Sequence, residues 1–178
     1  MEVKECMEIA KQFGFTTIVP MDVSTLEALQ SVRDMCAVNT CGMYGTNWSC
    51  PPNCGTVSEC EEKMKKYSKG VLLQTVGDIE DSLDWEGMME VKEKHNKAFI
   101  AFYDKLFETC DNFLALADGP CVRCAKCTCP DEPCRFPEKR FSSMEAFGLY
   151  VSGVCKSNNT RYNYGEGKMC YTGCILFE

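Results

Sequence analysis

Residues 119–136 read GPCVRCAKCTCPDEPCRF and hold five cysteines in eighteen positions, which restricts what this part of the chain can form. Three follow the spacing C-x2-C-x2-C and a fourth lies further along; the four are Cys121, Cys124, Cys127 and Cys134. A chain coiling around a 4Fe–4S cubane can place three such thiols on three irons, and a more distant cysteine closes the fourth. Zinc sites more often use two separated C-x2-C pairs. The spacing therefore favours an iron–sulfur cluster, with zinc, another metal or a metal-free thiol cluster as alternatives.

A second cysteine-rich segment, residues 36–55, reads CAVNTCGMYGTNWSCPPNCG. Its spacing, C-x4-C-x8-C-x3-C, is irregular, and the candidate ligands are Cys36, Cys41, Cys50 and Cys54. Pro51 and Pro52 stiffen the chain after Cys50, and Tyr44 and Trp48 could shield a cluster from solvent. Glycines in the segment would let backbone N–H groups approach sulfur, contacts that tune a cluster's potential. We expect a second metal-binding loop here; the alternative is a Pro/Gly-rich turn with incidental thiols.

The chain carries 15 cysteines, an odd number that cannot be fully paired within one chain. The N-terminal sequence MEVKECMEIAKQFGF is charged and amphipathic and lacks the features of a secretory signal. No apolar stretch approaches the roughly 18 residues that span a bilayer. These features predict a cytoplasmic protein without a membrane segment, whose thiols are metal ligands or redox groups rather than disulfides.

The formal net charge of -7 argues against nucleic acid as the main partner, because phosphate binding needs a basic footprint. The same acidic surface would suit docking to a basic redox partner. His95, the one histidine, lies on an apolar helical stripe and is expected in the core. A Rieske centre and His-rich zinc catalysis are therefore excluded. Glycine-rich nucleotide-binding and nucleophile-elbow motifs are also absent.

Hydrophobic periodicity predicts a mixture of helices and strands around the two loops. Helices are expected at 2–13, from a Ser24/Glu27 capping box, from a Thr56/Glu59 capping box towards Gly70, along a stripe from Trp85 to Cys110, and after Ser142/Glu145. Strands are expected at 16–20, 71–76 and 113–119, and the tail RYNYGEGKMCYTGCILF predicts two short strands joined by a turn. The order lacks regular βαβ alternation, so we predict a single α+β domain over residues 1–178 with a small mixed or antiparallel sheet, flanking helices and two cysteine-rich metal-binding loops.

The remaining cysteines receive weaker assignments. Cys6, Cys60 and Cys110 are interpreted as small core residues. Cys129 lies among the four candidate ligands of the 119–136 segment as a spare thiol. The C-terminal group could pack beside a cluster or supply a ligand; it comprises Cys155, Cys170 and Cys174.

Three stretches resemble a known family: VRDMCAVNTCGMYGTNWSCPPNCG, GPCVRCAKCTCPDEPCRFPEKRFSSMEAFGLYVSGVC and YTGCILF. They are similar to cysteine-rich predicted metal-binding proteins, a domain of unknown function in anaerobic bacteria and methanogenic archaea. The resemblance covers almost the whole chain and implies metal binding, with iron–sulfur favoured, through the eight cysteines named as candidate ligands. Cys129 stands where the family's second motif has an aromatic residue, so no ligand is implied there.

Together these observations favour an iron–sulfur protein with one or two 4Fe–4S clusters, acting in electron transfer or cluster delivery in an anaerobe. Its partner would be a redox protein or another metalloprotein. One alternative is a redox enzyme that uses an open cluster iron or a reactive thiol such as Cys129 or Cys155. The other is a structural module that binds zinc.

Overall fold

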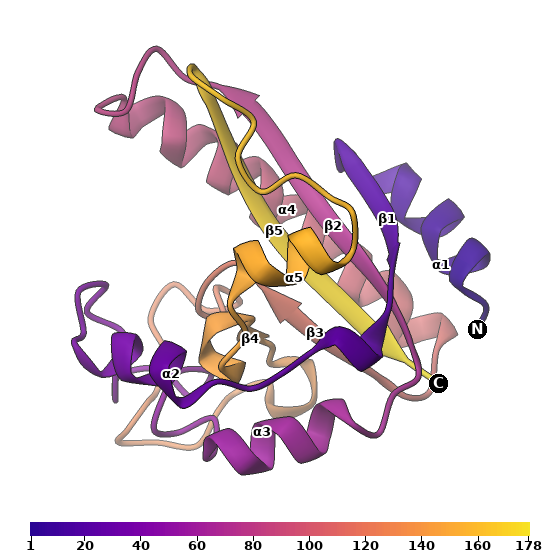
Figure 1. Ribbon diagram of the computed structural model, residues 1–178. Coiled ribbons are helices and arrows are strands. Elements are labelled where there is room, and N and C mark those ends of the chain that lie inside the picture. Colours follow the sequence, from indigo (N-terminus) through magenta and orange to yellow (C-terminus); the bar gives the residue numbers. More distant parts are fainter.

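The structure, a computed structural model that describes residues 1–178, is built around a five-stranded mixed sheet with helices on both faces (Figure 1). The strands are β1 (Thr17–Met21), β2 (Lys69–Asp78), β3 (Phe113–Ala117), β4 (Ser142–Ser143) and β5 (Lys168–Phe177). The helices are α1 (Val3–Ala10), α2 (Gln30–Ala37), α3 (Val57–Met64), α4 (Trp85–Thr109) and α5 (Val151–Ser157). Short 3-10 turns are η1 (Lys11–Phe13), η2 (Val23–Thr25), η3 (Pro137–Lys139) and η4 (Glu145–Phe147). The predicted α+β class and mixed sheet are confirmed.

The sheet has the strand order β1-β2-β5-β3-β4. Its centre is the antiparallel pair β2 and β5, which are in register from Lys69 opposite Phe177 to Asp78 opposite Lys168. β1 and β3 add antiparallel strands on either side, and β4 pairs in parallel with β3. Pro20, expected to end the first strand, lies within β1. A proline is tolerated there because β1 is an edge strand with only one neighbour.

Alternate side chains of the two central strands build two hydrophobic cores, one on each face of the sheet. Val71 and Leu73 of β2 pack with α1 and α4 on one face. Leu72 packs on the other face with Cys174 of β5 and with residues of α3 and α5. Both faces are covered, so β2 is buried from Gly70 to Thr75, as predicted for a buried strand.

Helix α4 lies along one face of the sheet with the predicted apolar stripe turned inward. His95 is completely buried and its Nδ1 lies 3.0 Å from the Thr75 hydroxyl, which confirms it as a core residue. Gly173 permits the close approach of helix and sheet, since a Cβ there would lie 2.7 Å from a ring carbon of Phe99.

Several predicted boundaries are wrong for local reasons. Ser24 lies in η2, where the Asp22 carboxylate accepts from both its N–H and its hydroxyl, so the next helix begins only at Gln30. Helix α3 has the predicted Thr56/Glu59 capping box but ends at Met64, and Gly70 belongs to β2. The C-terminal tail forms the single strand β5 rather than two, because it pairs with β2 along its whole length.

The segment after β3 also differs from its prediction. Ser142 does not cap a helix but belongs to β4, and the Ser143 hydroxyl accepts from the Ala146 N–H at the start of η4. The two cysteine-rich loops therefore leave and re-enter the fold at the same end of the sheet: one joins α2 to α3, and the other follows β3 (Figure 1).

Candidate metal centre

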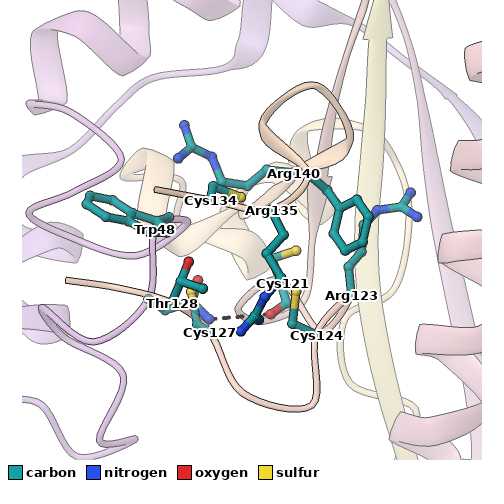
Figure 2. A pocket seen from close by; sticks show the side chains of 11 residues that line it. Trp48, Cys121, Arg123, Cys124, Cys127, Thr128, Cys134, Arg135 and Arg140 are labelled. Carbon is teal, nitrogen blue, oxygen red and sulfur yellow. Dashed lines mark hydrogen bonds between the residues drawn. The ribbon is translucent and has the colours of Figure 1, made fainter. Parts of the chain in front are cut away.

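The loop that follows β3 gathers all four of its predicted ligands around one cavity, as Figure 2 shows. Cys121, Cys124, Cys127 and Cys134 are each partly buried and line it together. The rest of the lining is Asn47, Trp48, Arg123, Thr128, Arg135, Phe136 and Arg140. The spacing in the sequence thus corresponds to a shared cavity with thiols on its wall, which we call the four-thiol cavity; its volume is only about 20 Å³, so a cubane would need the loop to open around it.

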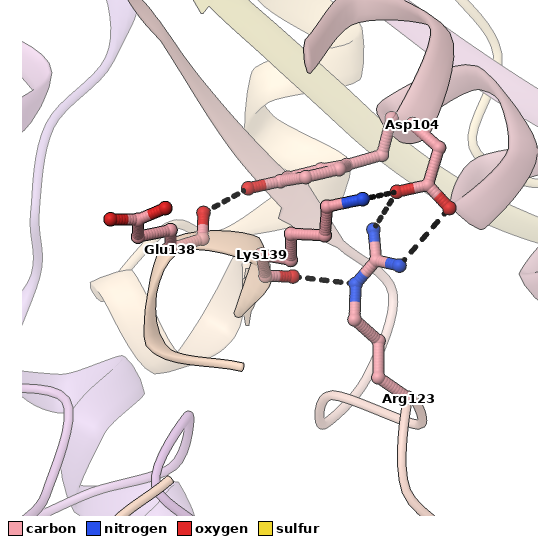
Figure 3. A network of polar contacts seen from close by, with 5 residues as sticks. Asp104, Arg123, Glu138 and Lys139 are labelled. Atoms are coloured by element: carbon pink, nitrogen blue, oxygen red, sulfur yellow. Dashed lines mark hydrogen bonds and ion pairs between the residues drawn. The ribbon is translucent and has the colours of Figure 1, made fainter. Parts of the chain in front are cut away.

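A partly buried ion-pair network anchors this loop to helix α4 (Figure 3). The guanidinium of Arg123 pairs with the Asp104 carboxylate at 2.9 Å, and its Nε donates to the Lys139 carbonyl at 2.6 Å. The same guanidinium lies 4.7 Å from the Tyr103 ring centre, and the Tyr103 hydroxyl donates to the Glu138 carbonyl at 2.9 Å. The segments on both sides of Cys124, Cys127 and Cys134 are therefore fixed to one rigid helix.

The two cysteine-rich loops are hydrogen-bonded to each other. The Cys121 N–H donates to the Ser49 hydroxyl at 2.9 Å, and the Trp48 indole donates to the Glu132 carbonyl at 3.0 Å. Cys129 is buried at this junction, where its sulfur accepts from the Asn53 amide at 3.1 Å and its thiol donates to the Gly45 carbonyl at 3.5 Å. Cys129 therefore joins the loops; it does not line the four-thiol cavity, but it lines a neighbouring cavity of about 460 Å³ together with Cys121, Cys124 and Cys127.

The loop between α2 and α3 forms a separate cavity, lined by three of its four predicted ligands: Cys36, Cys41 and Cys50. We call it the three-thiol cavity; its volume is about 240 Å³. Tyr44 lines it, whereas Trp48 of the same loop shields the four-thiol cavity instead. The structure therefore has two thiol sites, in contact through their loops.

Cys54, the fourth candidate of this loop, does not line the three-thiol cavity. It is buried, and its thiol donates to the Ala146 carbonyl at 3.6 Å. Its own carbonyl accepts from the Cys60 thiol at 3.8 Å, and hydrogen bonding with Cys60 holds the pKa of Cys54 above its ordinary value. Of the four cysteines with this irregular spacing, three therefore line one cavity and the fourth is turned into the core.

The Arg33 side chain of α2 holds the end of this loop against η4. It is almost fully buried, and its guanidinium donates to the Ala146 carbonyl at 2.7 Å and to the Gly55 carbonyl at 2.6 Å. One side chain thus ties α2 to η4 and to the end of the loop.

Burial raises the pKa of the cavity thiols. The pKa of Cys50 is raised to about 11, first by burial and then by the nearby charges of Cys41, Cys36 and Cys127. Burial likewise raises the pKa of Cys36 and Cys121. A bound cation inverts this preference, because thiols that coordinate a metal lose their protons.

The donor set fits a metal group with soft, thiolate-binding character. No three His, Cys, Asp or Glu side chains converge on a point where a single ion would be held. The thiols of the two cavities fit a metal group with thiolate ligands, a class that includes both zinc and iron–sulfur clusters.

Of the other thiols, Cys6, Cys60, Cys155 and Cys174 are buried in the core, as predicted for the first two, whereas Cys110 and Cys170 are only partly buried. Cys174 is completely buried in β5, and Cys155 of α5 lies 3.7 Å from the Gln74 amide. Cys170 lies near the Thr172 hydroxyl, and none of these three lines either thiol cavity. All fifteen cysteines are free thiols.

Sequence reasoning missed the charged residues that line the three-thiol cavity: Lys92, Asp118 and Glu145. They come from α4, from the end of β3 and from η4, so no local pattern joins them. Only Asp118 gave a signal, since it directly precedes the GPC motif.

Comparison with known proteins places the chain in one family. No curated protein and no solved structure matches it. None of its helices is both long and apolar enough to cross a membrane. The family described as predicted metal-binding protein (DUF2284) matches residues 2–177, nearly the whole chain, including both cysteine-rich loops. The chain therefore belongs to this family of predicted metal-binding proteins.

Proposed function

We propose that this protein is an iron–sulfur protein that holds a 4Fe–4S cluster in the four-thiol cavity and acts in electron transfer or cluster delivery. The observation that carries the proposal is the shared lining of that cavity by Cys121, Cys124, Cys127 and Cys134. Three of these thiols have the two-residue spacing with which a chain wraps a cubane, and Cys134 supplies the distant fourth. Membership of a predicted metal-binding family agrees with it.

Three arginines at the four-thiol cavity support a redox role. Arg123, Arg135 and Arg140 line it with the thiols. A cubane with four thiolate ligands is anionic, and its charge grows when it takes up an electron. Guanidinium groups nearby stabilise the reduced state most, and local charge is one of the factors that set cluster potentials.

The contact between the two loops supports electron transfer over a purely structural role. Hydrogen bonds through Ser49, Asn53 and Cys129 hold the two thiol cavities side by side. Two clusters in neighbouring cavities would provide a path from a protein surface to a second centre. The proposal therefore includes one cluster in each loop.

The chemistry of a partner follows from the charge around the four-thiol cavity. Residues 119–140 carry five cationic side chains (Arg123, Lys126, Arg135, Lys139 and Arg140) against three anionic ones (Asp131, Glu132 and Glu138). Although the whole chain has a net charge of -7, this loop has more cationic than anionic side chains, and Arg123 and Lys139 among them are ion-paired with Asp104 of α4. We therefore expect an acidic electron carrier to dock at the four-thiol cavity and a basic one elsewhere on the molecule.

Anaerobic reconstitution tests the proposal. Wild-type protein should take up iron and acid-labile sulfide in equal amounts, absorb broadly near 400 nm, and give an EPR signal after reduction. Cys127→Ala should lose the iron of the four-thiol cavity. Cys110→Ala is the matched control, because Cys110 lies beyond the end of α4 and lines neither cavity. A colourless protein that retains zinc and no sulfide under strict anaerobiosis would contradict the proposal.

A further inference from the structure

The three-thiol cavity differs from the four-thiol cavity in having charged groups opposite its sulfurs. Lys92, Asp118 and Glu145 line it together with Cys36, Cys41 and Cys50. Burial raises the pKa of Asp118 and raises the pKa of Glu145 to about 7, and the Lys92 ammonium on the same wall lowers both. Its volume of about 240 Å³ leaves room for a small molecule beside a metal group.

Asp118 has no hydrogen-bond partner in this cavity. Both of its carboxylate oxygens are buried, and neither accepts a hydrogen bond from the protein. A buried carboxylate without donors is costly, so such a group in a native structure calls for a partner from outside the chain. Its position on the cavity wall points to a bound molecule with hydrogen-bond donors.

The set of thiols is incomplete for a cubane. Cys54 is turned into the core, bonded to the Ala146 carbonyl and to Cys60, and it does not line the cavity. With three thiolates on four irons, one iron has no protein sulfur. That position would face the same cavity into which Asp118 and Glu145 are placed.

We propose that the loop between α2 and α3 binds its cluster through Cys36, Cys41 and Cys50 alone, and that the open position and the Lys92, Asp118 and Glu145 group together form a binding site for a small molecule. This inference rests on the proposed iron–sulfur function and adds a ligand site to it. It also reduces the four ligands expected from the sequence in this loop to three.

The charges define the ligand class. One end must offer an electron pair to iron, as a thiolate, amine or hydroxyl does. The other end must donate hydrogen bonds to Asp118. The wall carries two carboxyl groups and one ammonium group, so acceptor groups outnumber donor groups on the protein side. The site therefore selects small amino- or hydroxy-compounds and disfavours small carboxylates.

The ligand set is tested first by iron content. Cys54→Ala should keep the same iron and sulfide per chain as wild type, whereas Cys50→Ala, four residues earlier and also buried, should lose the iron of this loop. Alanine is used because serine can itself ligate iron. Loss of this iron in Cys54→Ala with a wild-type circular dichroism spectrum would overturn the inference. Loss of this iron in Asp118→Asn or Glu145→Gln would also overturn the inference, because a carboxylate would then be the fourth ligand of the cluster.

The ligand site is tested with three thiols that share one end and differ at the other: 2-aminoethanethiol, 2-mercaptoethanol and 3-mercaptopropionate. Each compound is titrated into reduced holoprotein from which added reducing thiols have been removed, and its binding is followed by EPR. We expect a shifted signal from one of the two clusters, with 2-aminoethanethiol binding at least about tenfold more tightly than 3-mercaptopropionate, a difference of about 1.4 kcal/mol. Asp118→Asn should keep its iron and lose most of this preference.

The two proposals fail in different ways. No shift with any thiol, or equal affinity for all three, overturns the ligand site while leaving an iron–sulfur protein. Absence of iron and sulfide in both loops overturns the proposed function itself. If Cys124→Ala loses the EPR shift and variants of the three-thiol cavity keep it, the open iron belongs to the loop after β3. That result would also overturn the inference.

Discussion

At the scale of single residues, the site depends on buried polar side chains that join segments distant in the sequence. Arg33 is the clearest, because one guanidinium holds both the Gly55 and the Ala146 carbonyls next to the three-thiol cavity. Asn53 and Ser49 do the same between the two loops. None has a recognisable motif, since its role depends on what the fold brings opposite it.

Arg33→Met should lower the free energy of unfolding by about 3 kcal/mol, because two buried carbonyls lose their donors while most of the apolar volume is kept. Arg161→Met is the matched control: Arg161 is exposed and its side chain makes no hydrogen bond or ion pair in the structure, so a change within about 0.5 kcal/mol is expected. Urea unfolding of the holoprotein measures both. Equal effects of the two substitutions would show that Arg33 does not clamp this corner.

His95 should make stability depend on pH on the acid side. Burial lowers its pKa from 6.5 to about 4, so between these values the unfolded chain binds a proton that the folded chain does not. The contribution is therefore complete above about pH 6.5 and decreases as the pH falls, reaching a loss of about 2 kcal/mol at about pH 5. His95→Gln cannot take up the proton. Urea unfolding at about pH 7.5 and about pH 5 should show a smaller difference for His95→Gln than for wild type; equal differences would contradict this.

At the scale of elements, helices and strands with local signals were predictable. The Thr56/Glu59 capping box, the apolar stripe of α4 and the apolar run of β2 each follow from spacing alone. The predicted start at Ser24 failed because Asp22 captures its hydrogen-bonding groups. The tail became one strand because β2 offers it a ten-residue partner, which no local pattern shows.

The Thr56 cap lies directly after the loop that carries the three-thiol cavity. Thr56→Ala should destabilise the protein by about 1 kcal/mol, because the Glu59 N–H loses its acceptor at the start of α3. Ser58→Ala, an exposed position in the same helix, should change stability by less than about 0.5 kcal/mol in either direction. The thermal midpoints of the two variants provide the comparison. If Thr56→Ala melts at the same temperature as Ser58→Ala, the cap has no stabilising role.

The candidate site was predictable in part. The C-x2-C-x2-C spacing with Cys134 identified four thiols that do share a cavity, because successive ligands in one loop are close by chain connectivity alone. The C-x4-C-x8-C-x3-C loop could not be assigned in the same way. Whether Cys54 faces the cavity or the core is decided by Ala146 and Cys60, which belong to other elements.

At the scale of the whole molecule, both cysteine-rich loops lie on one side of the fold, beside β3 and β4, and the long β2–β5 ribbon and α4 form its support (Figure 1). Two contacting loops, each with its own cavity, favour two metal groups over one enclosed between them. We expect the uneven charge, basic in residues 119–140 within an acidic chain, to give this side of the molecule a docking preference of its own.

Native mass spectrometry of the anaerobically reconstituted chain tests this view most directly, since it counts the bound metal groups and identifies their composition in one measurement. We predict a major species that carries two Fe4S4 units, and a Cys127→Ala species that carries one. A species with zinc alone, or a chain without inorganic sulfide, would contradict it.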